Sequence, residues 1–274
     1  MASRKNATDF ITALVAKYYN PRYKNKMTTK PYENPLRHYR QQYTRHEGEV
    51  AFQVLVEETD LHITACKNLS LEVAAYVTEL RGTLKSYCAF HPEFRDSLSP
   101  VVVPEHAALI IKRMAEAAEL ANVGPMAAVA GTISQMICEK FAYQSPELIV
   151  ENGGDIYMMS SKPRIAGLLP DPNSDATIGI KLDDTDFPVS ICASSATIGH
   201  SLSLGIGDLV AVRAKNGSLA DACATAFCNL LKEPDDIERV TQEAMRLQEH
   251  GIEGVFVQCK DKVSIWGKME LAVV

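Results

Sequence analysis

The stretch that most constrains the fold is Glu147–Tyr157, ELIVENGGDIY. Its two short apolar runs, Leu148–Val150 and Ile156–Met159, are joined by Asn-Gly-Gly-Asp. Tight turns between paired strands need residues with positive φ, which glycine adopts without steric cost. The pattern therefore predicts a β-hairpin. A plain turn explains it without any ligand, although two glycines also leave backbone N–H groups that a ligand can approach closely.

Length and charge limit the classes of protein that this chain can be. With 274 residues it can bury a large core, as one two-lobed domain or as two domains. Its net charge of −6 argues against nucleic-acid binding, which usually needs a basic face. No apolar run approaches the ~20 residues of a membrane span. The seven cysteines include no Cys-x-x-Cys pair, so we expect reduced thiols and a cytoplasmic protein.

The first 48 residues differ in pattern from the rest. Apolar positions between Phe10 and Tyr18 follow helical spacing, which predicts an amphipathic helix and not a signal peptide. Residues 20–48 are polar and contain Pro21, Pro31 and Pro35. We therefore expect residues 1–48 to form an N-terminal helix and an extended arm that wraps around a body beginning at residue 49.

The rest of the chain shows strand-like and helix-like patterns. Alternating or short apolar runs predict strands at residues 50–57, 61–66, 164–169, 177–182, 187–193, 209–214, 255–257, 263–266 and 269–273. Apolar stripes predict helices at residues 70–87, 105–121, 126–141, 219–231 and 236–250. Pro104 suits the opening of the second helix. Small residues begin the third, which favours tight packing and also leaves room for a flat ligand.

Asp221 and Thr225 are candidates for a metal site. They are four residues apart, so they share one face of the helix expected there, and they offer two hard oxygen ligands to Mg²⁺. Ser218 and Asp221 also match a capping box, in which Asp221 would bond back to the start of its own helix. Spacing alone leaves both interpretations open and favours the cap.

The segment 191–208 is rich in serine, threonine and glycine and contains His200. Hydroxyl groups and glycine amides suit a phosphate- or ribose-binding loop. His200 is a candidate general base, although a single loop histidine is more often a surface residue. The segment lacks the final glycine of a hydrolase G-x-S-x-G elbow, because Ser203 takes that place. Gly205-x-Gly207 lacks the third glycine of a dinucleotide fingerprint.

Several motifs, taken in order, resemble a known family. Glu151–Asp155, the Ser-Gly-His loop and Ala220–Ala226 follow the order seen in the ApbE family of FAD:protein FMN transferases. Glu57–Leu61, Val123–Gly131 and Val150–Asp155 resemble a branch of that superfamily, the UPF0280 proteins. The resemblance covers most of residues 40–270. It implies that residues 49–274 form an ApbE-like α+β fold, with two lobes of mainly antiparallel sheet flanked by helices and FAD in a cleft between them.

The same resemblance implies roles for individual residues. Asp221 and Thr225 match the side chains that hold Mg²⁺, and Gly131-Thr132 falls where the family supplies a backbone carbonyl to the metal. A turn near the flavin is matched by Asn152, Gly153, Gly154 and Asp155. Ser194 and Ser195 resemble a pair in the phosphate-side loop, and His200 matches the proposed catalytic histidine. The implied reaction transfers FMN from FAD to a protein acceptor.

Three departures from the family pattern concern the transfer step. His200 is followed by Ser-Leu-Ser-Leu, without the family's Asp-Pro, and Gln135 stands where the family has a lysine. We also expect this protein to lack the lipoprotein signal of the exported enzymes. The alternative to a transferase is a protein that binds a flavin or another nucleotide without cleaving it. The acceptor and the oligomeric state stay open, a homodimer included.

Overall fold

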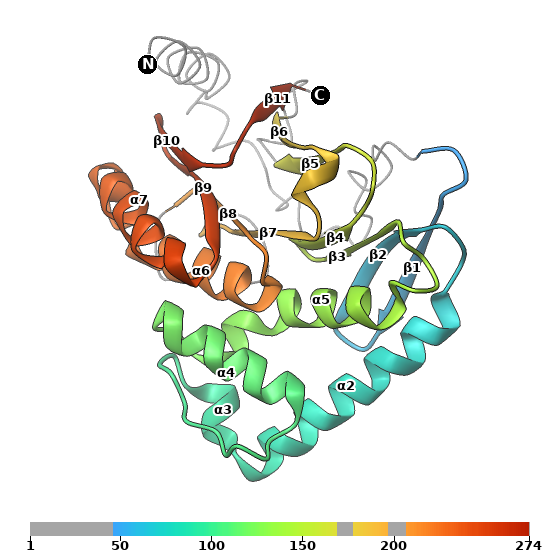
Figure 1. Cartoon of the computed structure of the whole chain (residues 1–274). Coiled ribbons are helices and arrows are strands. Elements are labelled where there is room, and N and C mark those ends of the chain that lie inside the picture. Colours follow the sequence, from blue (N-terminus) through green and yellow to red (C-terminus); the bar gives the residue numbers. More distant parts are fainter. Residues whose placement is uncertain (1–45, 169–177, 197–206, 274) are drawn as a thin grey trace, which may run out of the picture.

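The computed structural model describes residues 46–168, 178–196 and 207–273. These ranges form one eight-stranded and one three-stranded antiparallel sheet, with helices packed on one face of the larger sheet (Figure 1). The predicted α+β class is therefore confirmed. The predicted N-terminal helix and most of the arm lie outside the described ranges.

The larger sheet contains the predicted hairpin near its centre. Its strands are β1 Val50–Val56, β2 Thr59–Ala65, β3 Leu148–Asn152, β4 Asp155–Met159, β7 Val189–Ser194, β8 Leu209–Ala214, β9 Ile252–Cys259 and β10 Lys262–Gly267. Their order in the sheet is β1-β2-β3-β4-β7-β8-β9-β10. Asn152 pairs with Asp155 across the two glycines, and Gly153 has a φ of 79°. The turn thus uses glycine for the reason that the sequence indicated.

The smaller sheet covers the face of the larger sheet that the helices leave free. It consists of β5 Arg164–Leu168, β6 Ile178–Leu182 and β11 Leu271–Val273, in the order β11-β6-β5. Ile180 and Leu182 on β6 share an apolar cluster with Ile156 and Ile191 on the larger sheet. Because side chains alternate along a strand, the neighbouring positions of β4 and β7 face the helices instead.

The helices lie on the other side of the sheet and bury apolar stripes against its strands and against one another. They are α2 Ser70–Phe90, α3 Pro92–Asp96, α4 Leu109–Ala121, α5 Val129–Phe141, α6 Gly217–Leu230 and α7 Ile237–Arg246. Short 3₁₀ turns, Pro125–Ala128 and Leu247–His250, precede α5 and follow α7. In the described ranges, none of the helices has both the length and the hydropathy that a bilayer span requires.

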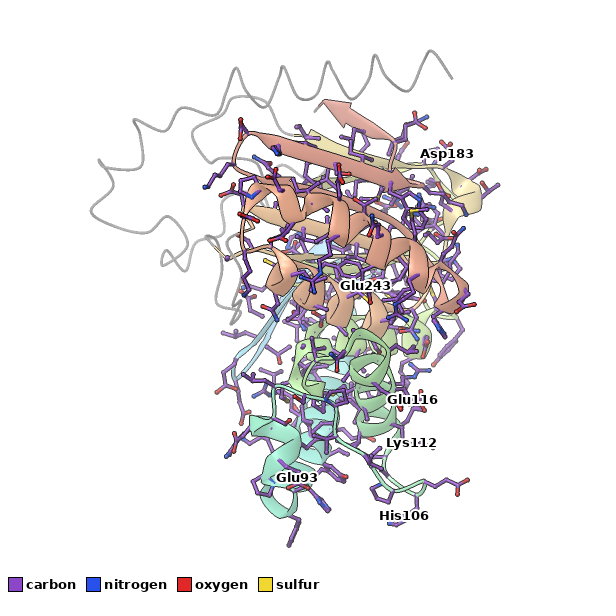
Figure 2. All side chains as sticks on the ribbon, turned by 90° about the vertical axis from the view of Figure 1, so that its left-hand side faces the viewer. Glu93, His106, Lys112, Glu116, Asp183 and Glu243 are labelled. Atoms are coloured by element: carbon purple, nitrogen blue, oxygen red, sulfur yellow. The ribbon has the colours of Figure 1, made fainter. Side chains whose placement is uncertain are left out.

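The predicted helix 105–121 starts later than expected. Pro104 accepts a hydrogen bond from the N–H of Ala107 in a turn, and Ala108 is extended with ψ of 150°. The helix begins only at Leu109. His106 lies in the loop before it and points away from the body (Figure 2). A proline tolerated at a helix start also suits a turn, so this prediction was wrong by one turn of helix.

Two buried arginines anchor the segments that connect the two sheets. Arg164, at the start of β5, donates to Glu147 at 2.8 Å and to Glu49 at 3.0 Å, and its side chain is 5% exposed. Arg213, on β8, donates to Glu253 at 3.1 Å and also binds Asp186. Buried charges persist where each has a partner of opposite sign, so these contacts fix how the two sheets meet.

Candidate functional site

The candidate site lies where β4 begins and β7 ends, next to the first turns of α5 and α6. The structure brings Asp155, Asp221 and the turn at Asn152 into this region. Asn152 Nδ2 donates to the carbonyl oxygen of Ala130 at 3.4 Å, which ties the turn to α5. His200 lies outside the described ranges, so its predicted role stays a prediction.

Asp155 is the first residue of β4 and faces the helices. Tyr157, two positions further, lies in the core on the helix side, whereas Ile156 packs towards the smaller sheet. The Asp155 carboxylate accepts the N–H of Ala193 at 3.3 Å and a hydrogen bond from the Cys192 thiol. Burial raises the pKa of Asp155 to about 7, with a further contribution from the charge of Glu151, although these two hydrogen bonds oppose the rise.

Asp221 caps a helix, but not its own. Its Oδ2 accepts the N–H of Gly131 in the first turn of α5 at 2.8 Å. The start of α6 is capped by Asn216, whose side chain accepts the N–H of Leu219 at 3.1 Å. The predicted capping box of Ser218 and Asp221 was therefore wrong. Asn216 already supplies the cap, which leaves the Asp221 carboxylate free to reach across to α5, where the N-cap residue is an alanine without a capping side chain.

The two carboxyl groups influence one another. Burial, followed by the charge of Asp155, raises the pKa of Asp221 well above its ordinary value, while the N–H groups of Gly131 and Ala130 oppose the rise. The hydrogen-bond partners named for both carboxylates are backbone N–H groups and a thiol, which carry no positive charge. Ionising both groups at once is therefore unfavourable unless a cation joins them.

The two threonines differ in what they offer a metal. Thr132, in the first turn of α5, donates its hydroxyl to the carbonyl of Ala128 at 2.5 Å and lies 2.8 Å from the hydroxyl oxygen of Ser218. Its side chain is thus engaged in helix packing, and the metal contact that the resemblance implied for the Gly131-Thr132 backbone stays a prediction. Thr225 lies one turn after Asp221 on α6 and is partly buried. Its hydroxyl shares a helix face with the Asp221 carboxylate.

Ser194 presents an unsatisfied hydroxyl to the helix side of the sheet. It is two positions beyond Cys192 on β7, so both side chains lie on the same face. Within the described residues, its oxygen is buried without a hydrogen-bond partner. Ser195 follows it and is also buried. Buried polar atoms normally have hydrogen-bond partners, so the Ser194 hydroxyl is an exception, and its predicted contact with a ligand stays a prediction.

The glycines of the turn leave the backbone open to approach. A Cβ atom added at Gly153 would meet no atom within 4 Å, and one added at Gly154 would meet only the carbonyl oxygen of Ala193, at 3.7 Å. A surface groove of about 620 Å³ lies elsewhere, between α2 and the start of α4. The candidate site is thus defined by its polar groups and not by that groove.

Sequence reasoning missed three contributors, Cys192, Gln135 and Gly217. Cys192 follows Ser190 by two positions, and its sulfur lies 3.3 Å from the Ser190 hydroxyl and 3.8 Å from the Gly217 carbonyl oxygen. Strand alternation was the only available signal for it. Gln135 was noted as a replacement, but its partner, the N–H of Gly217 at 2.7 Å, is 82 residues away. Gly217 itself stood outside the helix predicted at 219–231.

Alanine at Gly131 is expected to destabilise the protein by about 2–3 kcal/mol. Its Cβ would lie 2.2 Å from the Gly217 carbonyl oxygen and 2.8 Å from the Asp221 Cβ, and the first of these is backbone that cannot rotate away. Urea unfolding measures the change. Gly82 on α2 is the control, since a Cβ there meets nothing within 4 Å. Gly82→Ala should raise the free energy of unfolding by about 0.5–1 kcal/mol. Equal effects at both sites would contradict the close crossing of α5 and α6.

Comparisons with known proteins agree with this architecture. The family described as AbpE bacteria matches residues 40–265. A UPF0280 protein of Methanocaldococcus jannaschii is 37% identical over 223 residues, which cover 79% of this chain and 90% of that protein. A UPF0280 protein of Methanococcus aeolicus is 37% identical over 218 residues, which cover 77% and 84%.

Solved structures show the same fold at low sequence identity. The flavin transferase ApbE from Vibrio cholerae superposes with a TM-score of 0.52 at 12% identity, covering 80% of this chain and 97% of that protein. A mutant form of the same transferase superposes with a TM-score of 0.51 at 13% identity and with the same coverage. At such identity the likeness establishes the fold alone, whereas the archaeal relatives establish the family. The chain belongs to the UPF0280 family and has the ApbE-like α+β fold.

Proposed function

We propose that this protein binds FAD together with Mg²⁺ and transfers the FMN half to a protein acceptor, with release of AMP. The observation that carries the proposal is the buried pair of Asp155 and Asp221, whose hydrogen-bond partners among the described residues carry no positive charge. The unsatisfied hydroxyl of Ser194 at the end of β7 lends further support. The fold shared with flavin transferases makes a flavin the first ligand to test.

The donor set suits Mg²⁺. Asp221, Thr225 and a backbone carbonyl at Gly131-Thr132 would hold the ion, which prefers hard oxygen ligands and completes its shell with water and phosphate oxygens. Within the described part of the chain, no three His, Cys, Asp or Glu side chains group together as a metal site. A site with one or two carboxylates agrees with that finding. The bound ion would reduce the negative charge of the pyrophosphate and polarise it.

The chain's own groups would bind and orient the dinucleotide. The open backbone of Gly153 and Gly154 permits close contact with a flat ring or a phosphate. The Ser194 hydroxyl would donate to a phosphate oxygen and so gain the partner that it lacks. His200, in our proposal, accepts the proton of the incoming acceptor hydroxyl, which makes that oxygen a better nucleophile.

A second candidate function is flavin binding without transfer. The observation that favours it concerns Gln135, which stands at the position of the family's lysine and makes its hydrogen bonds within the protein. Its amide oxygen accepts the N–H of Gly217, and its amide nitrogen donates to Glu139 at 2.9 Å. Glutamine carries no charge, and both ends of this side chain are engaged within the protein, so this position offers a ligand neither a cation nor a free amide.

A titration with FAD separates the two candidates. We expect Mg²⁺-dependent FAD binding, followed by the equimolar appearance of AMP and of flavin bound to the acceptor. Fluorescence of the flavin reports binding, and chromatography of the same mixture reports AMP. Binding without AMP in the presence of Mg²⁺ supports the second candidate. Absence of FAD binding, with and without Mg²⁺, would refute both, and the EDTA-treated protein serves as the control.

A further inference from the structure

The N-terminal ends of α5 and α6 are each capped by a side chain from the second turn of the other helix. Asp221 on α6 accepts the N–H of Gly131, the third residue of α5, at 2.8 Å. Gln135 on α5 accepts the N–H of Gly217, the first residue of α6, at 2.7 Å. Each helix thus supplies the acceptor for an N–H group that the other cannot satisfy within its own first turn.

The two bonds lie on either side of a very close backbone contact. A Cβ at Gly217 would be 2.7 Å from the Gly131 carbonyl oxygen and 3.2 Å from the Gln135 Cβ. Between the two bonds, Thr132 and Ser218 join the helices through their hydroxyl groups at 2.8 Å. The crossing therefore has little freedom to slide or rotate while all three contacts are intact.

Gln135 is itself held in one orientation. Its amide nitrogen donates to Glu139 one turn further along α5, and Glu139 is paired with Arg113 of α4 at 2.7 Å. The amide oxygen is thereby directed at α6. A lysine at this position would supply a donor where the N–H of Gly217 requires an acceptor.

We propose that Gln135 is a positioning residue for Asp221. It fixes the start of α6 against α5, and because the Asp221 carboxylate lies one turn into α6, its place next to Gly131 and Asp155 depends on that anchor. The inference rests on the proposed function only for its consequence, which is the affinity of the site for a divalent cation. The positioning itself is a property of the protein without any ligand.

The test uses Gln135→Met, which keeps the length of the side chain and its helix propensity but removes the acceptor. Amide hydrogen exchange by NMR is the first readout. Positioning predicts faster exchange at Gly131 as well as at Gly217, because a displaced Asp221 no longer protects the Gly131 N–H. A purely local role predicts faster exchange at Gly217 alone. Gln242→Met, the same change at an exposed position of α7, is the matched control.

Cation affinity is the second readout, with Mn²⁺ alone as the probe. We expect Gln135→Met to weaken Mn²⁺ binding about tenfold, the size of one lost hydrogen bond. Gln135→Glu keeps an acceptor for Gly217 but loses the donor to Glu139 and meets its like charge, so it should restore only part of the protection of Gly131. Gln135→Asn keeps the amide but shortens the arm by one methylene, so it serves as the second disruptive variant if the methionine variant does not fold.

The outcomes separate this inference from the proposed function. Unchanged exchange at Gly131 in a folded disruptive variant overturns the positioning role, whatever the metal does. Faster exchange at Gly131, partly reversed in Gln135→Glu, supports it. If Gln135→Met shows faster exchange at Gly131 but the unaltered protein binds no Mn²⁺, the positioning role stands and the metal site of the proposed function is wrong.

Discussion

Asp221→Asn is expected to abolish Mg²⁺-dependent FAD binding, with an affinity loss of at least about 100-fold, while the protein stays folded. The amide oxygen of asparagine can still accept the N–H of Gly131, so the cap on α5 survives. The negative charge that would hold the cation does not. The substitution therefore separates the two roles that the sequence left open for Asp221.

The same variant should gain stability at pH 8 in the absence of a divalent cation, by about 1 kcal/mol. The folded-state pKa of Asp155, about 7, lies above its ordinary value of 3.8, so folding takes up protons in this range. The stability of the unaltered protein is thus expected to fall as the pH rises from about 4 to about 7, and removal of the neighbouring Asp221 charge relieves part of that loss.

Thermal unfolding at pH 6 and pH 8, with and without Mg²⁺, measures both effects. Mg²⁺ should raise the melting temperature of the unaltered protein and leave that of Asp221→Asn unchanged, because only a ligand that binds the folded state stabilises it. Asp221→Ala is the companion variant, which loses the cap as well as the charge. A full Mg²⁺ response in Asp221→Asn would show that Asp221 serves only as a helix cap.

Arg164→Met is expected to lower the free energy of unfolding by about 3–5 kcal/mol at pH 7. Glu49 and Glu147 would stay buried, at 2% and 9% side-chain exposure, without the cation that they share. Arg246→Met is the control. Its pair with Glu243 is an exposed contact one turn apart on α7, and its loss should cost less than about 0.5 kcal/mol.

The loss of stability at acidic pH tests the same cluster, Arg164 with Glu49 and Glu147. Burial alone would raise the pKa of Glu147, but hydrogen bonds from Ser160, Ser161 and Arg164 outweigh it and lower the pKa from 4.5 to about 2. A carboxyl group with a lowered folded-state pKa stabilises the protein above its unfolded pKa. That contribution, about 3 kcal/mol, is lost as the pH falls from about 4.5 to about 2.

Urea unfolding at pH 7, 5 and 2.5 follows that loss. Glu147→Gln should be less stable than the unaltered protein at pH 7 and should change less between pH 5 and pH 2.5. If Arg164→Met and Arg246→Met prove equally mild, the cluster does not hold the two sheets together in the way that its geometry indicates.

Local chemistry made the hairpin predictable, whereas the site depends on contacts between distant residues. The Asn-Gly-Gly-Asp turn needs only its own four residues, and the structure has it as expected. The partner of Asp221 is Gly131, 90 positions away, and no spacing rule reaches that far. Spacing therefore favoured the nearest explanation, a cap with Ser218, although Asn216 was already available two residues earlier.

The resemblance to a family supplied what spacing could not. It implied a metal-binding role for Asp221 and a place near the flavin for Asp155, and the structure places these two carboxyl groups close enough to influence each other. It could not indicate the roles of Cys192 or Gln135, because these residues act through a strand neighbour and a crossing helix. Their contributions follow from tertiary packing, which a linear pattern does not record.

The route of the chain through the two sheets has a consequence for how this family can diversify. After Met159 the chain leaves the larger sheet, builds β5 and β6, and returns on β7, the direct neighbour of the strand that it left. It departs and returns at the ends of β4 and β7 opposite to Asp155 and Cys192. Evolution, or a grafting experiment, can therefore replace the segment between β4 and β7 with one of another length while Asp155 and Asp221 keep their places. The replacement must retain an arginine that pairs with Glu147.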